Sequence, residues 1–140
     1  MTPLSAKVDI EVPFHDVDIM DVVWHGHYIK YLEIARCALL RVFNYDYPQM
    51  RASGYMWPIV ECQLKYVKPA RFGQRLEVSA KLVEYENRLR IQYEVRDKES
   101  QVRLTKATTT QVAVEMASGV LQLVSPPIVE QEIRRVWGLQ

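Results

Sequence analysis

The sequence predicts an α+β fold in which one antiparallel sheet wraps around one long central helix. Residues 28–43 are apolar on nearly every side of a helix, whereas residues 76–82 and 89–95 alternate apolar and polar side chains as half-buried strands do. A helix that is hydrophobic around most of its circumference must be enclosed, and a curved sheet encloses it on one side. We therefore expect a second copy of the chain to cover the other side, so that the protein is a homo-oligomer.

The elements follow in order along the chain. A strand over residues 7–14 comes first, and the polar segment 15–27 separates it from the helix. After the helix, the β-branched and alternating segments predict further strands at residues 57–67, 76–82, 89–95, 102–116 and 120–124, with a hairpin connection at 85–88. Residues 128–137 predict a short amphipathic helix that ends the domain.

Length and charge limit the classes of protein. The 140 residues fit one domain, which we place at 1–140, and a net charge of +1 excludes the strongly basic surface that nucleic-acid binding requires. No apolar run approaches the roughly 20 residues of a membrane span, and the N-terminal segment lacks the apolar stretch of a secretory signal. We expect a cytoplasmic protein without a nucleic-acid partner or a membrane span.

Ionisable side chains crowd the segment between the first strand and the helix. It holds all three histidines and three aspartates, namely His15, Asp16, Asp18, Asp21, His25 and His27. One interpretation is a metal site, with His25 and His27 as two ligands and Asp18 or Asp21 as a third. The histidine spacing does not match a helical i,i+4 pair, and neither cysteine lies nearby to complete the set. We therefore expect no metal and no cofactor.

Two other interpretations of this segment remain open. Aspartates that precede a helix cap its free N–H groups and favour the positive end of its dipole, which is a purely structural role. Alternatively, the same free N–H groups can hold the oxyanion of an acyl-transfer intermediate. A nearby carboxylate such as Asp18 would then attack a thioester carbonyl or activate water.

The segment FHDVDIMDVVWHGHY, residues 14–28, resembles the signature of the 4-hydroxybenzoyl-CoA thioesterase family. That signature is an aromatic residue, any residue, Asp, any residue, Asp, a short loop, two apolar residues, an aromatic residue, and Asn-Tyr at the start of a helix. The resemblance extends over residues 8–124. It implies a hotdog fold, a long helix wrapped by an antiparallel sheet, assembled into homodimers or homotetramers.

The resemblance also implies roles for individual residues. Asp18 matches the catalytic carboxylate, which acts as nucleophile or general base, and Asp16 matches the first Asp, which shapes the loop. His25 stands where a backbone N–H polarises the thioester carbonyl. His27 replaces the usual Asn that supports the loop, and Asp21 stands where the family has Gly, so that the turn or the local charge differs here.

Substrate contacts are expected from aromatic and basic residues. Trp24 and Trp57 are candidates to line the acyl slot, and Lys68, Arg88 and Arg90 are candidates to bind the phosphates of coenzyme A. Arg88 matches a basic hairpin that contacts the nucleotide in relatives. The resemblance thus implies an enzyme that hydrolyses an acyl-CoA thioester to free acid and coenzyme A. Two alternatives stay open: a non-catalytic module that binds acyl-CoA or an acyl-carrier protein, and an acyl-thioester hydratase.

Overall fold

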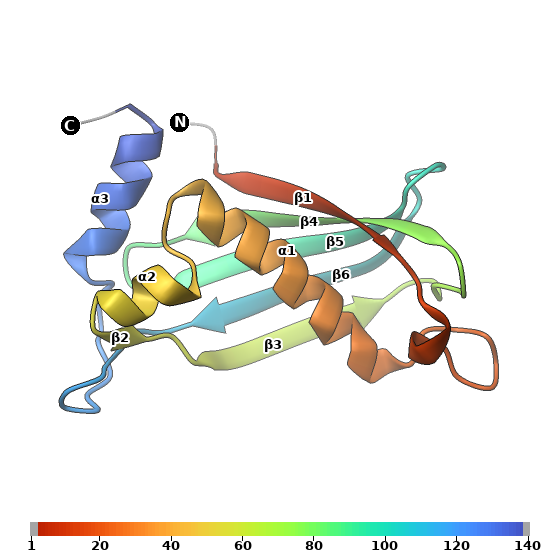
Figure 1. The fold of residues 1–140 in the computed structure, drawn as a ribbon, viewed down its shortest axis with the longest axis horizontal. Helices are drawn as coiled ribbons and strands as arrows, with labels where there is room; N and C mark the ends of the chain where they lie inside the picture. Colours follow the sequence, from red (N-terminus) through yellow and green to blue (C-terminus); the bar gives the residue numbers. More distant parts are fainter. Residues whose placement is uncertain (1–2, 139–140) are drawn as a thin grey trace.

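A long helix lies across one face of a five-stranded antiparallel sheet in the computed structural model (Figure 1), which describes residues 3–138. The elements in chain order are β1 (Ser5–Glu11), η1 (Phe14–Asp16), η2 (His25–His27), α1 (Tyr28–Val42), α2 (Tyr47–Ala52), β2 (Tyr55–Met56), β3 (Ile59–Tyr66), β4 (Arg75–Glu84), β5 (Leu89–Asp97), β6 (Arg103–Gln111), β7 (Val114–Glu115) and α3 (Pro127–Val136). The predicted α+β class with one central helix is confirmed.

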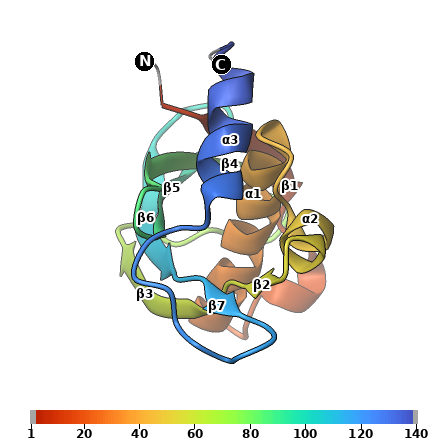
Figure 2. The same ribbon diagram turned by 90° about the vertical axis from the view of Figure 1, so that its left-hand side faces the viewer.

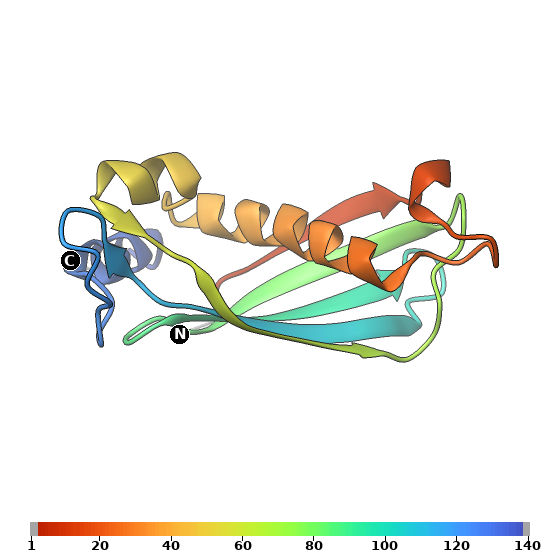
Figure 3. The ribbon, with the colours of Figure 1, turned by 90° about the horizontal axis from the view of Figure 1, so that it is seen from below.

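The sheet has the strand order β1-β4-β5-β6-β3, and every neighbouring pair is antiparallel. The crossover from β1 through α1 to β3 places these two strands at opposite edges. The sheet curves around the helix, as Figure 3 shows from below. Because α1 begins where η2 ends, the loop between β1 and α1 lies at one end of the sheet, and the β4–β5 hairpin lies at the other.

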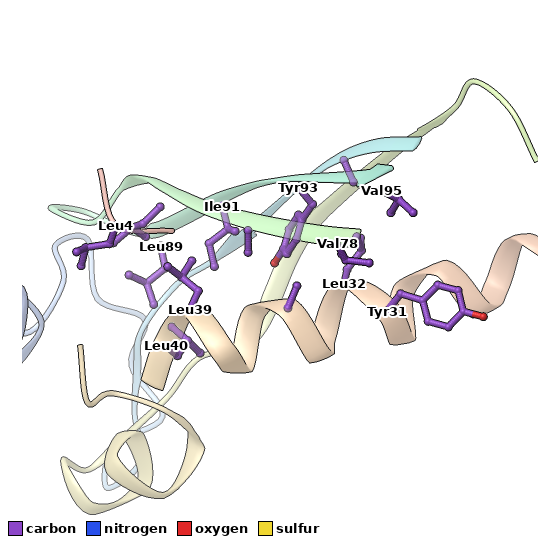
Figure 4. Close-up of a cluster of buried hydrophobic side chains, with 14 of the residues drawn as sticks. Leu4, Tyr31, Leu32, Leu39, Leu40, Val78, Leu89, Ile91, Tyr93 and Val95 are labelled. Atoms are coloured by element: carbon purple, nitrogen blue, oxygen red, sulfur yellow. The ribbon is translucent and has the colours of Figure 1, made fainter. Parts of the chain in front are cut away.

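The core lies between the concave face of the sheet and one side of α1 (Figure 4). The apolar residues predicted to alternate in β4 and β5 are buried there, Val78 and Ile91 among them. They pack against helix residues such as Leu32 and Leu39. The opposite side of α1 is uncovered in the single chain, with Ile29 and Ile34 exposed by 42% and 43%. The sheet thus encloses the helix on one side only.

Two strand predictions are wrong. The segment 102–116 is not one strand, because β6 ends at Gln111 and β7 pairs instead with β2 in a separate two-stranded ladder. Residues 120–124 form no strand, and a single bridge between Val114 and Leu121 is their only ladder contact. Leu123 is 84% exposed, so that the apolar side chains of this segment have no sheet or helix to pack on.

The two shorter helices pack at the β4–β5 end of the sheet (Figure 2). The predicted amphipathic C-terminal helix is confirmed as α3, which buries Val129 and Ile133 on one side. α2 was not expected, although the sequence carries its signals: a capping box formed by Asp46 and Gln49, and a proline in the first turn. Among residues 3–138, no helix has both the length and the apolar character needed to cross a membrane.

Candidate active site

Asp18 begins a tight turn in the loop that precedes α1. Its backbone N–H donates to the Val22 carbonyl at 2.9 Å, and the Asp21 N–H donates back to the Asp18 carbonyl at 3.0 Å. Asp21 takes a left-handed conformation, with φ of 62°, which a residue with a side chain adopts only at a cost. Glycine adopts this conformation without that cost, and here Asp21 takes it with a side chain.

The Asp18 carboxylate is exposed, and one of its two oxygen atoms accepts a short hydrogen bond. Its Oδ1 atom accepts the Met20 N–H at 2.8 Å, an Asx turn that fixes the orientation of the side chain. Within the described part of the chain, Oδ2 makes no hydrogen bond or ion pair. One oxygen therefore holds the turn while the other remains open to water.

The helix begins beside this turn. The His27 N–H donates to the Trp24 carbonyl at 2.9 Å. The N–H groups of the two preceding residues, His25 and Gly26, have no acceptor among residues 3–138. Such N–H groups at a helix start can bind a negatively charged oxygen. The turn that returns the chain to the helix is anchored by the Val23 N–H, which donates to the Ala70 carbonyl at 2.8 Å.

A hollow of about 190 Å³ brings four of the predicted site residues together. It is lined by Asp18, Val22, Val23, Trp24, His25, Tyr28, Tyr66, Val67, Lys68 and Pro69. Asp18, Trp24, His25 and Lys68 were expected at the site from the sequence. The lining combines one carboxylate and one ammonium group with aromatic and apolar side chains.

Tyr66, at the end of edge strand β3, was not expected in the site. Its hydroxyl donates to the His25 carbonyl at 3.2 Å, and its ring lies 4.6 Å from the His25 ring and 5.1 Å from the Tyr28 ring. Burial raises the pKa of Tyr66, so that the hydroxyl stays protonated and can donate. The sequence offers no signal for this contact, because Tyr66 lies 41 positions from His25.

Asp16 is buried and lies away from the hollow. Its carboxylate accepts Lys30 Nζ and the Tyr31 hydroxyl, each at 2.6 Å, and His27 Nδ1 lies 3.7 Å away. Burial pushes the pKa of Asp16 upward, but the hydrogen bonds from Lys30 and Tyr31 outweigh it and hold the pKa below its ordinary value. Asp16 thereby ties the loop to the first turn of α1, the place expected for a residue that shapes the loop.

Three predicted substrate contacts lie elsewhere in the single chain. Trp57 is buried and its indole N–H donates to the Tyr45 hydroxyl at 3.0 Å. Arg88 pairs with Glu84 at 2.8 Å in the β4–β5 hairpin, and Arg90 follows in β5. This end of the sheet is opposite to the Asp18 turn (Figure 1), so that one chain does not bring Trp57, Arg88 and Arg90 to the hollow.

The metal interpretation lacks a geometric basis in the described residues. No group of three or more His, Cys, Asp or Glu side chains is arranged there to hold a metal ion. The Lys30 ammonium group occupies Oδ1 of Asp16, the atom nearest to His15 and His27. The His25 ring instead packs at a tilt against the Tyr66 ring.

The sequence of this chain matches the model of a known protein family. The model of the thioesterase-like superfamily matches residues 12–134, which include the loop, α1 and every strand of the five-stranded sheet except β1. The chain belongs to the thioesterase-like superfamily. The family resemblance of the Asp18 loop and the hotdog fold expected from it are thereby confirmed.

Proteins with similar sequences include a candidate esterase of Synechocystis, 28% identical over 93% of this chain and 79% of that protein. A candidate acyl-CoA thioesterase of Bacillus subtilis is 30% identical over 57% of this chain and 58% of its own length. The matched segment thus spans little more than half of the latter relative.

Solved structures agree on the fold. A hypothetical protein from Thermus thermophilus is 30% identical and superposes with a TM-score of 0.78 over 97% of this chain and 98% of that one. A DHNA-CoA thioesterase from Staphylococcus aureus reaches a TM-score of 0.83 at 20% identity, over 96% of this chain and 91% of its own, and this likeness concerns the fold alone.

Proposed function

We propose that the protein hydrolyses an acyl-CoA thioester to a free acid and coenzyme A. The observation that carries the proposal is the hollow lined both by the open Asp18 carboxylate and by His25, whose N–H has no acceptor among residues 3–138. Membership of the thioesterase-like superfamily and the acyl-CoA thioesterase relatives support the same chemistry. No metal or cofactor takes part in the reaction as proposed.

The thioester carbonyl oxygen accepts the His25 N–H, and Asp18 Oδ2 takes a proton from a water molecule whose oxygen attacks the carbonyl carbon. The negative charge that forms on the carbonyl oxygen is stabilised by the N–H groups at the helix start. When the tetrahedral intermediate collapses, the C–S bond breaks and the proton on Asp18 passes to the departing thiolate. In the alternative role, Oδ2 attacks the carbonyl carbon itself, and the C–S bond breaks to leave a mixed anhydride and the thiolate. Water then hydrolyses the anhydride to the free acid and the Asp18 carboxylate, and its remaining proton passes to the thiolate.

We further propose that the working unit is a homodimer formed through β3. This strand is an edge of the sheet, and Val60 and Tyr66 are exposed by 57% and 42%, although long, apolar edges are usually protected. A two-fold axis perpendicular to the sheet pairs β3 with β3 of a second copy in antiparallel orientation. In the same dimer, the second copy would also cover the exposed side of α1.

The same symmetry explains the location of the remote substrate residues. In the antiparallel pair, the β4–β5 end of one sheet lies next to the Asp18 end of the other. Arg88 and Arg90 of the second copy then approach the hollow from across the interface, where they are proposed to bind the nucleotide phosphates. Lys68 contributes from the same chain as Asp18.

A nearly isosteric substitution tests the proposal. Asp18→Asn keeps the Oδ1 contact with Met20 but removes the proton acceptor, so that release of thiol from acyl-CoA should fall at least about 100-fold. Asp21→Asn is the matched control, since it alters a carboxylate of the same turn that does not line the hollow, and it should retain activity. If Asp18→Asn keeps most of its turnover while binding acyl-CoA, the chain is a binding module and hydrolysis is not its function.

A further inference from the structure

A second hollow, of about 900 Å³, lies on the face of the sheet that turns away from α1. The alternation of the strands sets its lining: Ala80 and Leu82 are buried beneath the helix, so that Lys81 between them points outward. The strands β3, β4, β5 and β6 all contribute to it. Figure 3 shows this face on the side of the sheet opposite to α1.

The charge of this hollow is strongly uneven. Four cationic side chains line it, Lys65, Lys81, Arg103 and Lys106, against a single carboxylate, Glu94. Glu94 lies opposite Lys106 in the register, but its carboxylate pairs with Arg96. None of the four cations has a hydrogen bond or an ion pair within residues 3–138. The whole chain carries only +1, so that a local excess of this size is not a general property of the surface.

Lys65 and Lys106 are directly opposite each other in the β3–β6 ladder. Like charges in this position repel and destabilise the strand pair. Both side chains are exposed and neither packs in the core, so that stability alone gives no reason for the pair. An anion between the two ammonium groups would turn the repulsion into attraction on both sides.

We propose that this hollow binds the phosphate groups of a nucleotide. Lysine is a point-charge partner for phosphate, while Ser79, Gln92 and Thr108 in the lining supply hydroxyl and amide groups for a sugar and a base. The volume lies in the range of small-molecule sites. A second copy does not fit this face, because two such surfaces would bring like charges together.

The nucleotide has two possible sources, a free nucleotide or the nucleotide part of coenzyme A. In the second case the inference rests on the proposed thioesterase function, and this hollow then binds the phosphates of coenzyme A in place of Arg88 and Arg90. Titration calorimetry of the full chain with ADP and with coenzyme A, at constant ionic strength, measures both. The double variant Lys65→Gln/Lys106→Gln should weaken the ligand that binds here at least about tenfold, since each lost charge costs a charge-assisted contact.

Arg51→Gln, which removes an exposed cation of α2, is the matched control and should bind as the wild type does. The double variant should unfold at the same temperature as the wild type or higher, because the repulsion is gone, and Lys81→Gln provides a second test at a single site. If neither ligand binds, or if the double variant binds both as tightly as the wild type, the inference is wrong.

The KM for acyl-CoA distinguishes the two sources of the nucleotide. A raised KM for acyl-CoA in the double variant assigns the site to coenzyme A, and ADP binding with an unchanged KM assigns it to a free nucleotide. The Asp18→Asn variant should bind either ligand at the outer face like the wild type. A failure of hydrolysis and a failure of nucleotide binding are therefore visible separately.

Discussion

The Tyr66 hydroxyl donates a hydrogen bond to the carbonyl oxygen of His25, and this bond ties edge strand β3 to the turn that begins α1. The His25 carbonyl also accepts the Tyr28 N–H. The peptide group between His25 and Gly26, which presents the Gly26 N–H and follows the His25 N–H directly in the chain, thus donates no bond within the described residues but is held at its carbonyl by two donors. Tyr66 is in this sense a positioning residue for the proposed oxyanion donors.

Removing the Tyr66 hydroxyl tests whether it positions the N–H donors or contributes to substrate binding. Tyr66→Phe keeps the ring contacts with His25 and Tyr28 but loses the hydrogen bond, so that the donors are less well fixed. We expect kcat to fall about tenfold with KM little changed, and stability to fall by about 1 kcal/mol. Steady-state kinetics and chemical denaturation measure the two effects. Tyr47→Phe, at an exposed tyrosine of α2, is the control, and an unchanged kcat in Tyr66→Phe contradicts the role.

The Trp24 indole lies directly over Gly26, where an added Cβ would come within 2.1 Å of the ring. Gly26→Ala must therefore displace the indole, which lines the hollow. Alanine favours the helix, so that stability should change by no more than about 1 kcal/mol. We expect KM for acyl-CoA to rise and the tryptophan emission to shift.

The pairing of Trp24 and Gly26 predicts a specific rescue. Trp24→Phe removes the part of the indole that meets the new Cβ, so that Gly26→Ala should have a smaller effect on KM in the Trp24→Phe background. Equal effects in both backgrounds would mean that Gly26→Ala acts through something other than the ring above it.

The Asp16 carboxylate should make the free energy of unfolding depend on pH in the acid range. Its pKa in the folded protein is below the ordinary 3.8, so that its contribution is present above the unfolded pKa and is lost as the pH falls through the folded pKa. Asp16→Asn should lower the free energy of unfolding by about 2 kcal/mol at pH 6, and the difference from wild type should shrink below about pH 4. Denaturation curves at several pH values measure this, and a difference that stays constant down to pH 2 would exclude the Asp16 carboxylate as its source.

The proposed dimer makes a prediction about mixed subunits. Arg88→Ala should raise KM more than it lowers kcat, because phosphate contacts are the same in the ground and transition states. When Arg88→Ala and Asp18→Asn chains are refolded together, a mixed dimer contains one site with both native residues. Activity at low substrate concentration should then exceed that of either variant alone. No gain on mixing, with mixed dimers present, would place Arg88 outside the site of the second copy.

Local patterns were sufficient for most of the fold. The alternation in β4 and β5 and the apolar run of α1 reflect which side chains face the core, and that information lies in neighbouring residues. The same reasoning failed at 120–124, where an apolar segment has no surface to pack on. It also missed α2, because a helix of 6 residues is too short to show a period and is marked only by its cap.

The loop between β1 and α1 is one continuous segment, and for that reason the sequence alone determined that a carboxylate, Asp18, would lie beside the start of the helix. The folded chain was needed to show that Tyr66, at the end of β3, completes the hollow, and that Trp57, before β3, and Arg88, in the β4–β5 hairpin, lie at the opposite end of the sheet. Contacts between distant segments depend on strand order and register, which are fixed by the packing of the whole chain rather than by any local run of residues.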